Sequence, residues 1–285
     1  MTKRHSVLAL GLVALAALNV MAALRPSDMP ARPDAAAAFQ EEGAEPEFPG
    51  PYDWGQIAGV RQQGTSGKDV RVTRVPEAGD PAACQIQSET SVIADGRYVY
   101  VGFNDRRDCT TLIGASWTGF ARSEDGGETF DDLGPIPATP EIGDVYGDPV
   151  LAVDTSGDAR GTLYLGSLSS SGLALGVSTD RGKTFEWRGV PPAEGSADKE
   201  WLAVDNTGGR YDGRLYLAWI NFAPDAGDEP RLDLSYSDDS GKTWAPAVAL
   251  AKGGSTGVRV AIGPRGEVHT VWEDVTCFDC PRPIY

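Results

Sequence analysis

Ser123-Glu-Asp-Gly-Gly-Glu-Thr-Phe130 is the stretch that decides the fold, because it recurs as Ser178-Thr-Asp-Arg-Gly-Lys-Thr-Phe185 and again as Ser237-Asp-Asp-Ser-Gly-Lys-Thr-Trp244. The copies share the frame Ser-x-Asp-x-Gly-x-Thr-aromatic, and they are nearly evenly spaced along the chain. A repeat at this distance is typical of folds in which one supersecondary unit is used several times. The sequence therefore predicts a repeat architecture before any single strand is assigned.

Each residue type in the frame suits a tight turn between two strands. The aspartate can accept backbone N–H bonds within the turn, and the glycine can take a positive φ at little cost. The threonine suits the start of the returning strand, and the aromatic ring can pack between neighbouring sheets. We expect these structural roles for Ser123, Asp125, Gly127, Thr129, Phe130, Ser178, Asp180, Gly182, Thr184, Phe185, Ser237, Asp239, Gly241, Thr243 and Trp244.

The segments around the frame repeat in the same register. A first strand is expected at 92–95, 151–154, 202–205 and 260–263, and a second at 99–102, 163–166, 215–218 and 268–271. A third strand leads into each frame, at 117–122, 173–177 and 232–236. Short β-rich strands with Gly and Asp turns, in units of four, are typical of propeller blades.

The repeated phrase resembles the Asp-box, or BNR repeat, of the sialidase-like β-propeller superfamily, and the resemblance covers roughly residues 84 to 285. It implies an all-β propeller with four-stranded blades, of which about three and a half are present, as part of a propeller that usually has six blades. In that superfamily the box is a structural element that lies away from the catalytic face, so it implies no catalytic role for the box residues.

The fourth repeat has its first two strands, then Cys277-Phe-Asp-Cys280 and a short end at Ile284-Tyr285, with no fourth box. We expect the chain to be a fragment of a longer propeller, because an open propeller leaves unpaired strand edges. Two alternatives remain. The N-terminal segment, including a stray strand at 70–75, could close a smaller propeller, or several chains could close it by oligomerisation.

The N-terminal part has a different composition. Residues 1–24 carry Lys3 and Arg4 before a long apolar stretch, which predicts a secretory signal or an uncleaved N-terminal anchor. Residues 25–52 are rich in Ala, Pro and Glu and predict a flexible linker, and residues 53–285 form the propeller region. We therefore expect a secreted, periplasmic or cell-surface protein that contacts a membrane only through such an anchor.

The net charge, the cysteines and the Gly-Lys-Thr triplets each limit the kinds of partner and ligand that we expect for the chain. The net charge of -16 argues against nucleic acid and against anionic membranes. Four cysteines in an exported chain predict disulfides: Cys84 could meet Cys109, and Cys277 could pair with Cys280 or elsewhere. A zinc site would need a second pair beside Cys277 and Cys280. The Gly-Lys-Thr triplets lack the earlier glycine of a phosphate loop and join strands, so they do not predict nucleotide binding.

Charged residues precede the first strand of each repeat. In a propeller these innermost strands line the central channel, and the loops after the second strands open on the same face. We expect a ligand-binding mouth there that suits a polyol, a glycan or an extracellular protein. The alternative is that these polar residues only cap loops and hydrate the channel. The residues expected at the mouth are Glu89, Asp148, Asp198, Lys199, Glu200 and Arg259.

The resemblance also implies what a sialidase site would need: a three-arginine cluster, an aspartate acid/base and a Tyr–Glu nucleophile pair from a late blade. The arginines to consider are Arg74, Arg106, Arg107 and Arg259, and the catalytic candidates are Asp148, Asp198 and Glu200. Thr73-Arg74-Val75-Pro76 lacks the aromatic residue of the family's Phe/Tyr-Arg-Ile-Pro motif. No cofactor is expected; calcium in the acidic loop 225–229 is a further alternative, although the loop has no ordered Asp-x-Asp-x-Asp ligand pattern.

Three functions follow from these patterns. The first is a propeller that binds a glycan or a protein without a complete catalytic site. The second is an exo-sialidase-like, retaining glycoside hydrolase whose Tyr–Glu pair comes from further blades. The third is an extracytoplasmic assembly or scaffold protein. The fold by itself does not choose among them.

Overall fold

The computed structural model describes residues 70–73, 86–106, 116–190, 196–222 and 229–274. The chain divides into two units, Met1–Thr65 and Ser66–Tyr285, and every described residue belongs to the second. The expected signal or anchor and the expected linker therefore lie outside the described residues. Within the described part, no helix is long and apolar enough to cross a membrane.

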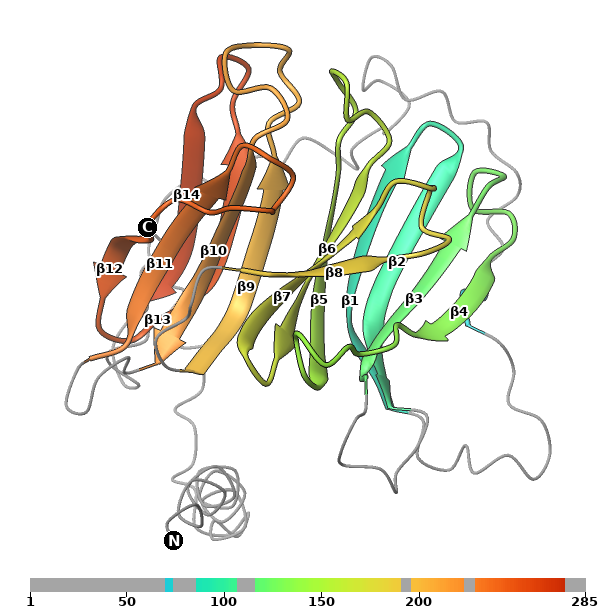
Figure 1. The fold of residues 1–285 in the computed structure, drawn as a ribbon, viewed down its shortest axis with the longest axis horizontal. Coiled ribbons are helices and arrows are strands. Elements are labelled where there is room, and N and C mark those ends of the chain that lie inside the picture. The colour runs from blue at the N-terminus through green and yellow to red at the C-terminus, as the bar shows by residue number, and fades with distance from the viewer. Residues whose placement is uncertain (1–69, 74–85, 107–115, 191–195, 223–228, 275–285) are drawn as a thin grey trace, which may run out of the picture. The chain divides into compact units, whose positions relative to one another are not determined.

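The described chain is made of antiparallel strands that pair in sequence order (Figure 1). The first sheet contains β1 (Ile86–Asp95), β2 (Tyr98–Arg106), β3 (Thr118–Ser123) and β4 (Asp131–Pro135). The second contains β5 (Val145–Val153), β6 (Leu163–Ser169), β7 (Gly172–Ser178) and β8 (Glu186–Gly189). The third contains β9 (Ser196–Val204), β10 (Leu215–Phe222), β11 (Arg231–Ser237) and β12 (Val248–Lys252), and β13 (Ser255–Ile262) pairs with β14 (Val268–Asp274).

These sheets are the predicted blades. Three four-stranded sheets and one two-stranded sheet confirm the all-β propeller and its three and a half repeats. The total of six blades stays a prediction. The expected strand at 70–75 is wrong over its described part, because residues 70–73 form no strand. This segment instead makes a side-chain contact, in which Thr73 Oγ1 donates to Gln87 Oε1 at 3.2 Å, and Val72 packs against Val101 and Phe103.

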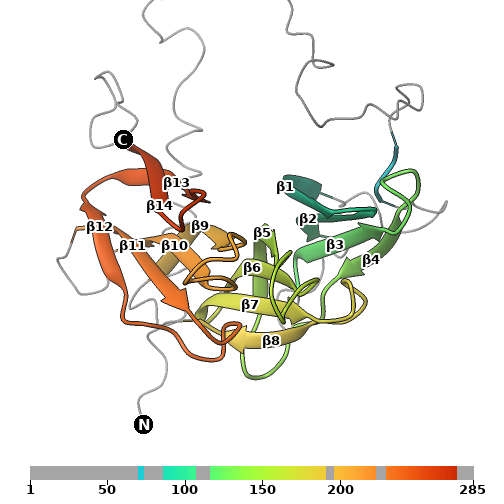
Figure 2. The same cartoon turned by 90° about the horizontal axis from the view of Figure 1, so that it is seen from above.

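Neighbouring sheets pack face to face around the inner strands β1, β5, β9 and β13. Each inner strand contacts the next, and the view from above shows the sheets following one another in an arc (Figure 2). The middle strands of the second and third sheets are covered by a described sheet on each face, so they are largely apolar rather than alternating. Leu163, Tyr164 and Leu165 of β6 are all fully buried. Apolar burial between the sheets therefore supplies the main stabilisation of the fold.

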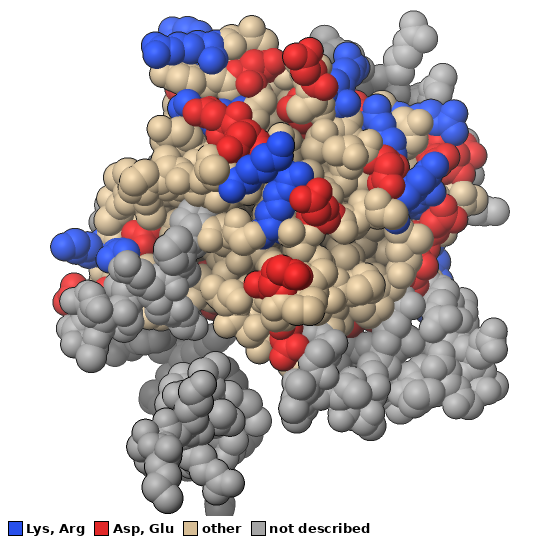
Figure 3. Space-filling model, viewed as in Figure 1, with Lys and Arg blue, Asp and Glu red and all other residues tan. Residues whose placement is uncertain are grey.

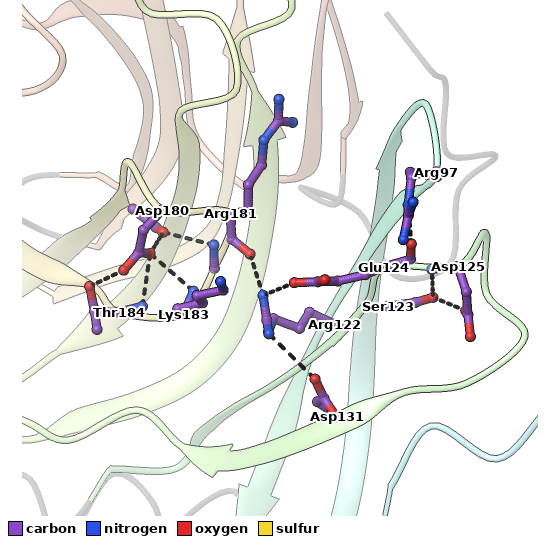
Figure 4. Close-up of polar contacts among 12 residues, drawn as sticks. Arg97, Arg122, Ser123, Glu124, Asp125, Asp131, Asp180, Arg181, Lys183 and Thr184 are labelled. Atoms are coloured by element: carbon purple, nitrogen blue, oxygen red, sulfur yellow. Dashed lines mark hydrogen bonds and ion pairs between the residues drawn. The ribbon is translucent and has the colours of Figure 1, made fainter.

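The turn in each repeated phrase is held by a set of side-chain hydrogen bonds (Figure 4). Asp180 Oδ1 accepts the backbone N–H of Thr184 at 2.9 Å, and Asp180 Oδ2 accepts the Thr184 hydroxyl at 2.7 Å. Ser178 Oγ donates to Asp180 and accepts the N–H of Gly182 at 2.8 Å. Burial would raise the pKa of Asp180, but these bonds outweigh it and lower that pKa to about 2. The aspartate is therefore held in its ionised form.

The phrase also fixes one sheet to the sheet before it. Gly182, at φ +77, lies so close to the Phe120 ring that an added Cβ would be 2.8 Å from two ring atoms. Gly241, at φ +82, faces Leu175 in the same way, with an added Cβ at 2.2 Å. Arg122 of β3 donates to the backbone oxygen of Arg181 at 3.3 Å (Figure 4). Each of these two turns is thus part of an interface between blades.

Candidate functional site

A bulge recurs at the start of each inner strand, where two residues oppose one residue of the paired strand. The first of the two residues has a positive φ each time: Glu89 at 49°, Asp148 at 53°, Lys199 at 50° and Gly257 at 63°. A bulge of this kind favours glycine, because only glycine adopts such a conformation freely. Three of the four positions carry a long or charged side chain instead, which makes them candidates for a functional role.

The three charged bulge residues meet at their tips. Lys199 Nζ lies 3.3 Å from both carboxylate oxygens of Glu89 and 3.0 Å from Asp148 Oδ2. Asn104, near the end of β2, holds Asp148 from the other side. Its Oδ1 accepts the Asp148 N–H at 2.6 Å, and its Nδ2 donates to Asp148 Oδ1 at 3.2 Å. The cluster therefore links residues from β1, β2, β5 and β9.

These side chains line a cleft of about 610 Å³, which we call the mouth cleft. Its lining is Glu89, Thr90, Ser91, Val92, Asp148, Pro149, Val150, Lys199, Glu200, Trp201 and Arg259. A second, mainly apolar cavity of about 500 Å³ follows along the inner strands and shares Ser91, Val92 and Trp201 with it. The Arg259 guanidinium lies 4.2 Å from the Trp201 ring centre and donates to the Val258 carbonyl at 2.8 Å, so it is held in place.

Glu200 is the unusual residue of the mouth cleft. It is 5 % exposed, and neither carboxyl oxygen has a hydrogen-bond partner among the described residues. Buried carboxyl groups are normally hydrogen-bonded, and an exception calls for an explanation. Burial raises the pKa of Glu200 well above its usual value, and the nearby Asp148 and Asp198 charges raise it further. Burial therefore favours the protonated form of Glu200, which lies in the wall of the mouth cleft.

The other two carboxyl groups differ from Glu200. Burial would raise the pKa of Asp148, but its bonds with Glu89, Lys199 and Asn104 outweigh it, so the net shift is downward. The adjacent Asp148 carboxylate raises the pKa of Glu89. One cleft thus holds a carboxyl group whose pKa is lowered, Asp148, and one whose pKa is raised, Glu200. Pairs with separated pKa values are the usual basis of acid–base chemistry in enzymes.

The structure places the predicted site residues as follows. Glu89, Asp148, Lys199, Glu200 and Arg259 share the mouth cleft. Asp198 is the neighbour of this cluster rather than part of the lining, and its Oδ1 accepts the Lys199 N–H at 2.7 Å. Arg106 ends β2, and its side chain is not among those described. The remaining predicted residues lie outside the described residues: Arg74, Arg107, Cys84, Cys109, Cys277 and Cys280.

Sequence reasoning missed Trp201, and it placed Asn104 only in a loop that opens on the mouth face. Asn104 positions Asp148, and Trp201 forms a wall of the cleft beneath Arg259. Asn104 directly follows the apolar core of the second strand, which is the signal that could have identified it. Within the described residues no group of three or more His, Cys, Asp or Glu side chains is arranged to hold a metal ion. Most of the acidic loop 225–229 lies outside that part of the chain.

The substitution Lys199→Gly tests whether the Lys199 side chain serves ligand binding or the stability of the fold. Glycine relieves the left-handed backbone, worth about 1–2 kcal/mol, but adds chain entropy of about 0.5–1 kcal/mol and loses partly exposed ion pairs of about 0–1 kcal/mol each. We expect the free energy of unfolding to stay within about 1 kcal/mol of wild type while ligand binding weakens. Urea unfolding and binding titrations measure the two effects. A large stability loss would mean that Lys199 is structural.

No protein-family profile and no curated protein sequence matches the chain significantly. Solved structures do match. An α-L-arabinofuranosidase of Fusarium graminearum, in complex with an iminosugar inhibitor, aligns with a TM-score of 0.55 and 16% identity over 72% of this chain and 64% of that protein. The α-L-arabinanase of Penicillium chrysogenum, complexed with arabinobiose, aligns with a TM-score of 0.53 and 16% identity over the same shares, 72% and 64%. The chain thus has the fold of propeller glycoside hydrolases and spans 64% of the length of these proteins.

Proposed function

We propose that this chain is an exported Asp-box propeller of the sialidase-like kind that binds a glycan in the mouth cleft. The observation that carries the proposal is the bulge cluster, in which Glu89, Asp148 and Lys199 hold left-handed backbone conformations and meet around one point. A structural role would be served by glycine, as at Gly257. Strained charged residues at a cleft are typical of binding and catalytic sites.

The chemistry of the cleft suits a glycan. Carboxylates accept hydrogen bonds from sugar hydroxyls, cations donate to sugar oxygens, and the Trp201 ring offers an apolar surface. A neutral sugar fits better than a sialoside. Lys199 is already paired with two carboxylates, and Arg259 lies on Trp201, so the described lining offers no free arginine cluster for a substrate carboxylate.

Glu200 favours a second candidate function, glycoside hydrolysis. Glu200 lines the cleft and burial favours its protonated form, so it could donate its proton to the glycosidic oxygen as the bond to the anomeric carbon breaks. The ionised Asp148 could then act on the anomeric carbon, either directly or through a water that it deprotonates. This assignment places the acid and the nucleophile or base within the described residues, without a residue from further blades.

Partners and location remain part of the proposal. The acidic net charge and the N-terminal apolar segment support an exported protein that binds no nucleic acid. Acidic and basic side chains are interspersed over the face in Figure 3, which agrees with solubility rather than with a patch for a charged polymer. A protein partner at the same cleft is the scaffold alternative.

Glycan binding and glycan hydrolysis are measured in parallel for the wild type and for the variants Glu200→Gln and Asp148→Asn. The full chain is titrated with arabinobiose, xylobiose and sialyllactose, and release of reducing sugar is followed in parallel. For a binding protein we expect no turnover and at least a tenfold loss of affinity in Asp148→Asn. For a hydrolase we expect a loss of kcat of about 100-fold or more in Glu200→Gln, in line with general-acid catalysis.

Glu267→Gln is the matched control, because this carboxylate lies in the turn between β13 and β14 and does not line the mouth cleft. It should leave binding and turnover unchanged. If Asp148→Asn and Glu200→Gln both behave like this control towards a sugar that the wild type binds, the mouth cleft is not the site.

A further inference from the structure

In three of the repeats an aspartate ends the first strand or directly follows it, and two of these residues, Asp154 and Asp205, are buried. Asp154 Oδ1 accepts the N–H of Ser156 at 2.9 Å, and Asp205 Oδ1 accepts the N–H of Thr207 at 2.9 Å, so each carboxylate caps the turn that follows it. The other carboxylate oxygen of each residue, Oδ2, needs a hydrogen-bond or ion-pair partner of its own. In the first repeat the equivalent residue, Asp95, pairs through Oδ2 with the guanidinium of Arg181.

Arg181 belongs to the repeated phrase of the next sheet, so this ion pair crosses the interface between blades. The residue has a left-handed backbone, with φ 64°, and its guanidinium also lies 4.5 Å from the centre of the Tyr98 ring. Its backbone oxygen accepts a hydrogen bond from Arg122 of the first sheet. A guanidinium group thus fills the space between the turn of one blade and the phrase of the next.

The second interface has the same backbone arrangement without this group. Ser240 stands at the position of Arg181, with φ 59°, and its backbone oxygen accepts a hydrogen bond from Arg188 of the second sheet. Thr162 stands where the first repeat has Tyr98. Asp154 is 1 % exposed, and its Oδ2 has no hydrogen-bond partner among the described residues. The partner that Asp95 has is therefore missing for Asp154.

A cavity of about 390 Å³ lies at this position. Its lining includes Asp154, Ser156, Asp158, Asp212, Asp238 and Ser240. Asp212 is used by Ser156 and by the N–H of Gly208, and Asp238 is paired with Arg214 at 2.6 and 2.8 Å. Asp154 therefore supplies a buried carboxylate oxygen without a partner among the described residues, in a wall that also holds Asp158, Asp212 and Asp238.

We propose that this cavity binds a guanidinium group in the place that Arg181 fills in the preceding interface. The ligand would donate to Asp154 Oδ2 and to the acidic wall, as Arg181 donates to Asp95. A metal ion fits less well, because the described residues contain no arrangement of three or more acidic side chains, His or Cys that could hold one. The site is distinct from the mouth cleft, and no residue lines both cavities.

The test is a set of thermal unfolding curves of the full chain with agmatine, with the capped tripeptide Gly-Arg-Gly, with putrescine and with CaCl2. At agmatine concentrations about ten times Kd we expect Tm to rise by about 3 °C or more. Asp154→Asn should lose this rise. Asp205→Asn is the matched control, because Asp205 is an equally buried aspartate that does not line the cavity, and it should keep the rise.

Ser240→Arg gives a second, independent readout. An arginine here should occupy the cavity from within, raise Tm in the absence of any ligand and abolish the agmatine response. A response to agmatine alone points to a small free guanidine compound, and an equal response to the tripeptide points to an arginine side chain. The proposal fails if agmatine gives no shift, if the shift persists in Asp154→Asn, or if putrescine or CaCl2 gives the Asp154-dependent shift instead.

Discussion

Gly182→Ala is expected to lower the free energy of unfolding by about 2–5 kcal/mol. Two costs combine: a non-glycine residue at φ +77 costs about 1–2 kcal/mol, and overpacking of a core costs about 1–3 kcal/mol. The new Cβ would lie 2.8 Å from two atoms of Phe120. This ring cannot move aside freely, because it is fully buried and packs edge-on against Phe185 at 4.9 Å. Urea unfolding of both proteins measures the difference.

Gly127→Ala is the control, since Gly127 holds the same position in the first copy of the phrase. Its φ is +92, but the nearest atoms to an added Cβ are 3.9 Å away. It should therefore show only the backbone cost of about 1–2 kcal/mol. Equal losses in the two variants would show that the phrase is a local turn, without the role in blade packing that the structure indicates.

Glu200→Gln is expected to stabilise the protein increasingly as the pH rises. Burial raises the pKa of Glu200 in the folded state above the ordinary 4.5 that it regains on unfolding. Between these two values the folded state keeps a proton that the unfolded state releases, so wild-type stability falls with rising pH. The fall is about 1.4 kcal/mol per pH unit across that window. Glutamine does not titrate, so the free energy of unfolding of Glu200→Gln should not show this decrease with rising pH.

The measurement is the unfolding free energy of wild type and Glu200→Gln in urea from pH 5 to pH 8. Asp180→Asn is the control of opposite sign. The pKa of Asp180 is lowered to about 2, so its contribution is lost only as the pH falls from about 4 towards 2. The difference in unfolding free energy between wild type and Asp180→Asn should therefore be constant from pH 5 to pH 8. A difference between wild type and Glu200→Gln that does not change with pH would mean that Glu200 is ionised in the fold.

The order of the strands could be predicted well from the chain alone, but the first strand of each repeat begins earlier than expected, at Ile86, Val145, Ser196 and Ser255. The repeated Ser-x-Asp-x-Gly-x-Thr-aromatic phrase and the apolar strands around it depend on contacts between near neighbours in sequence, and these leave a pattern. The grouping of Glu89, Asp148, Lys199 and Arg259 could also be anticipated, because the inner strands of a propeller start on one face. The strand expected at 70–75 was wrong over residues 70–73, since a β-rich composition does not show whether a ladder partner is near.

The sequence by itself determined the repeat, the antiparallel blades and the face on which charged residues gather, because these follow from periodicity and chain connectivity. Only the tertiary structure decided how deeply those residues are buried and which groups they pair with. It showed that Glu200 is buried without a partner, that Lys199 joins two carboxylates, and that Asp154 lacks the arginine that Asp95 has. Burial and ion pairing depend on atoms from different blades, and contacts of that range have no signature in the local order of residues.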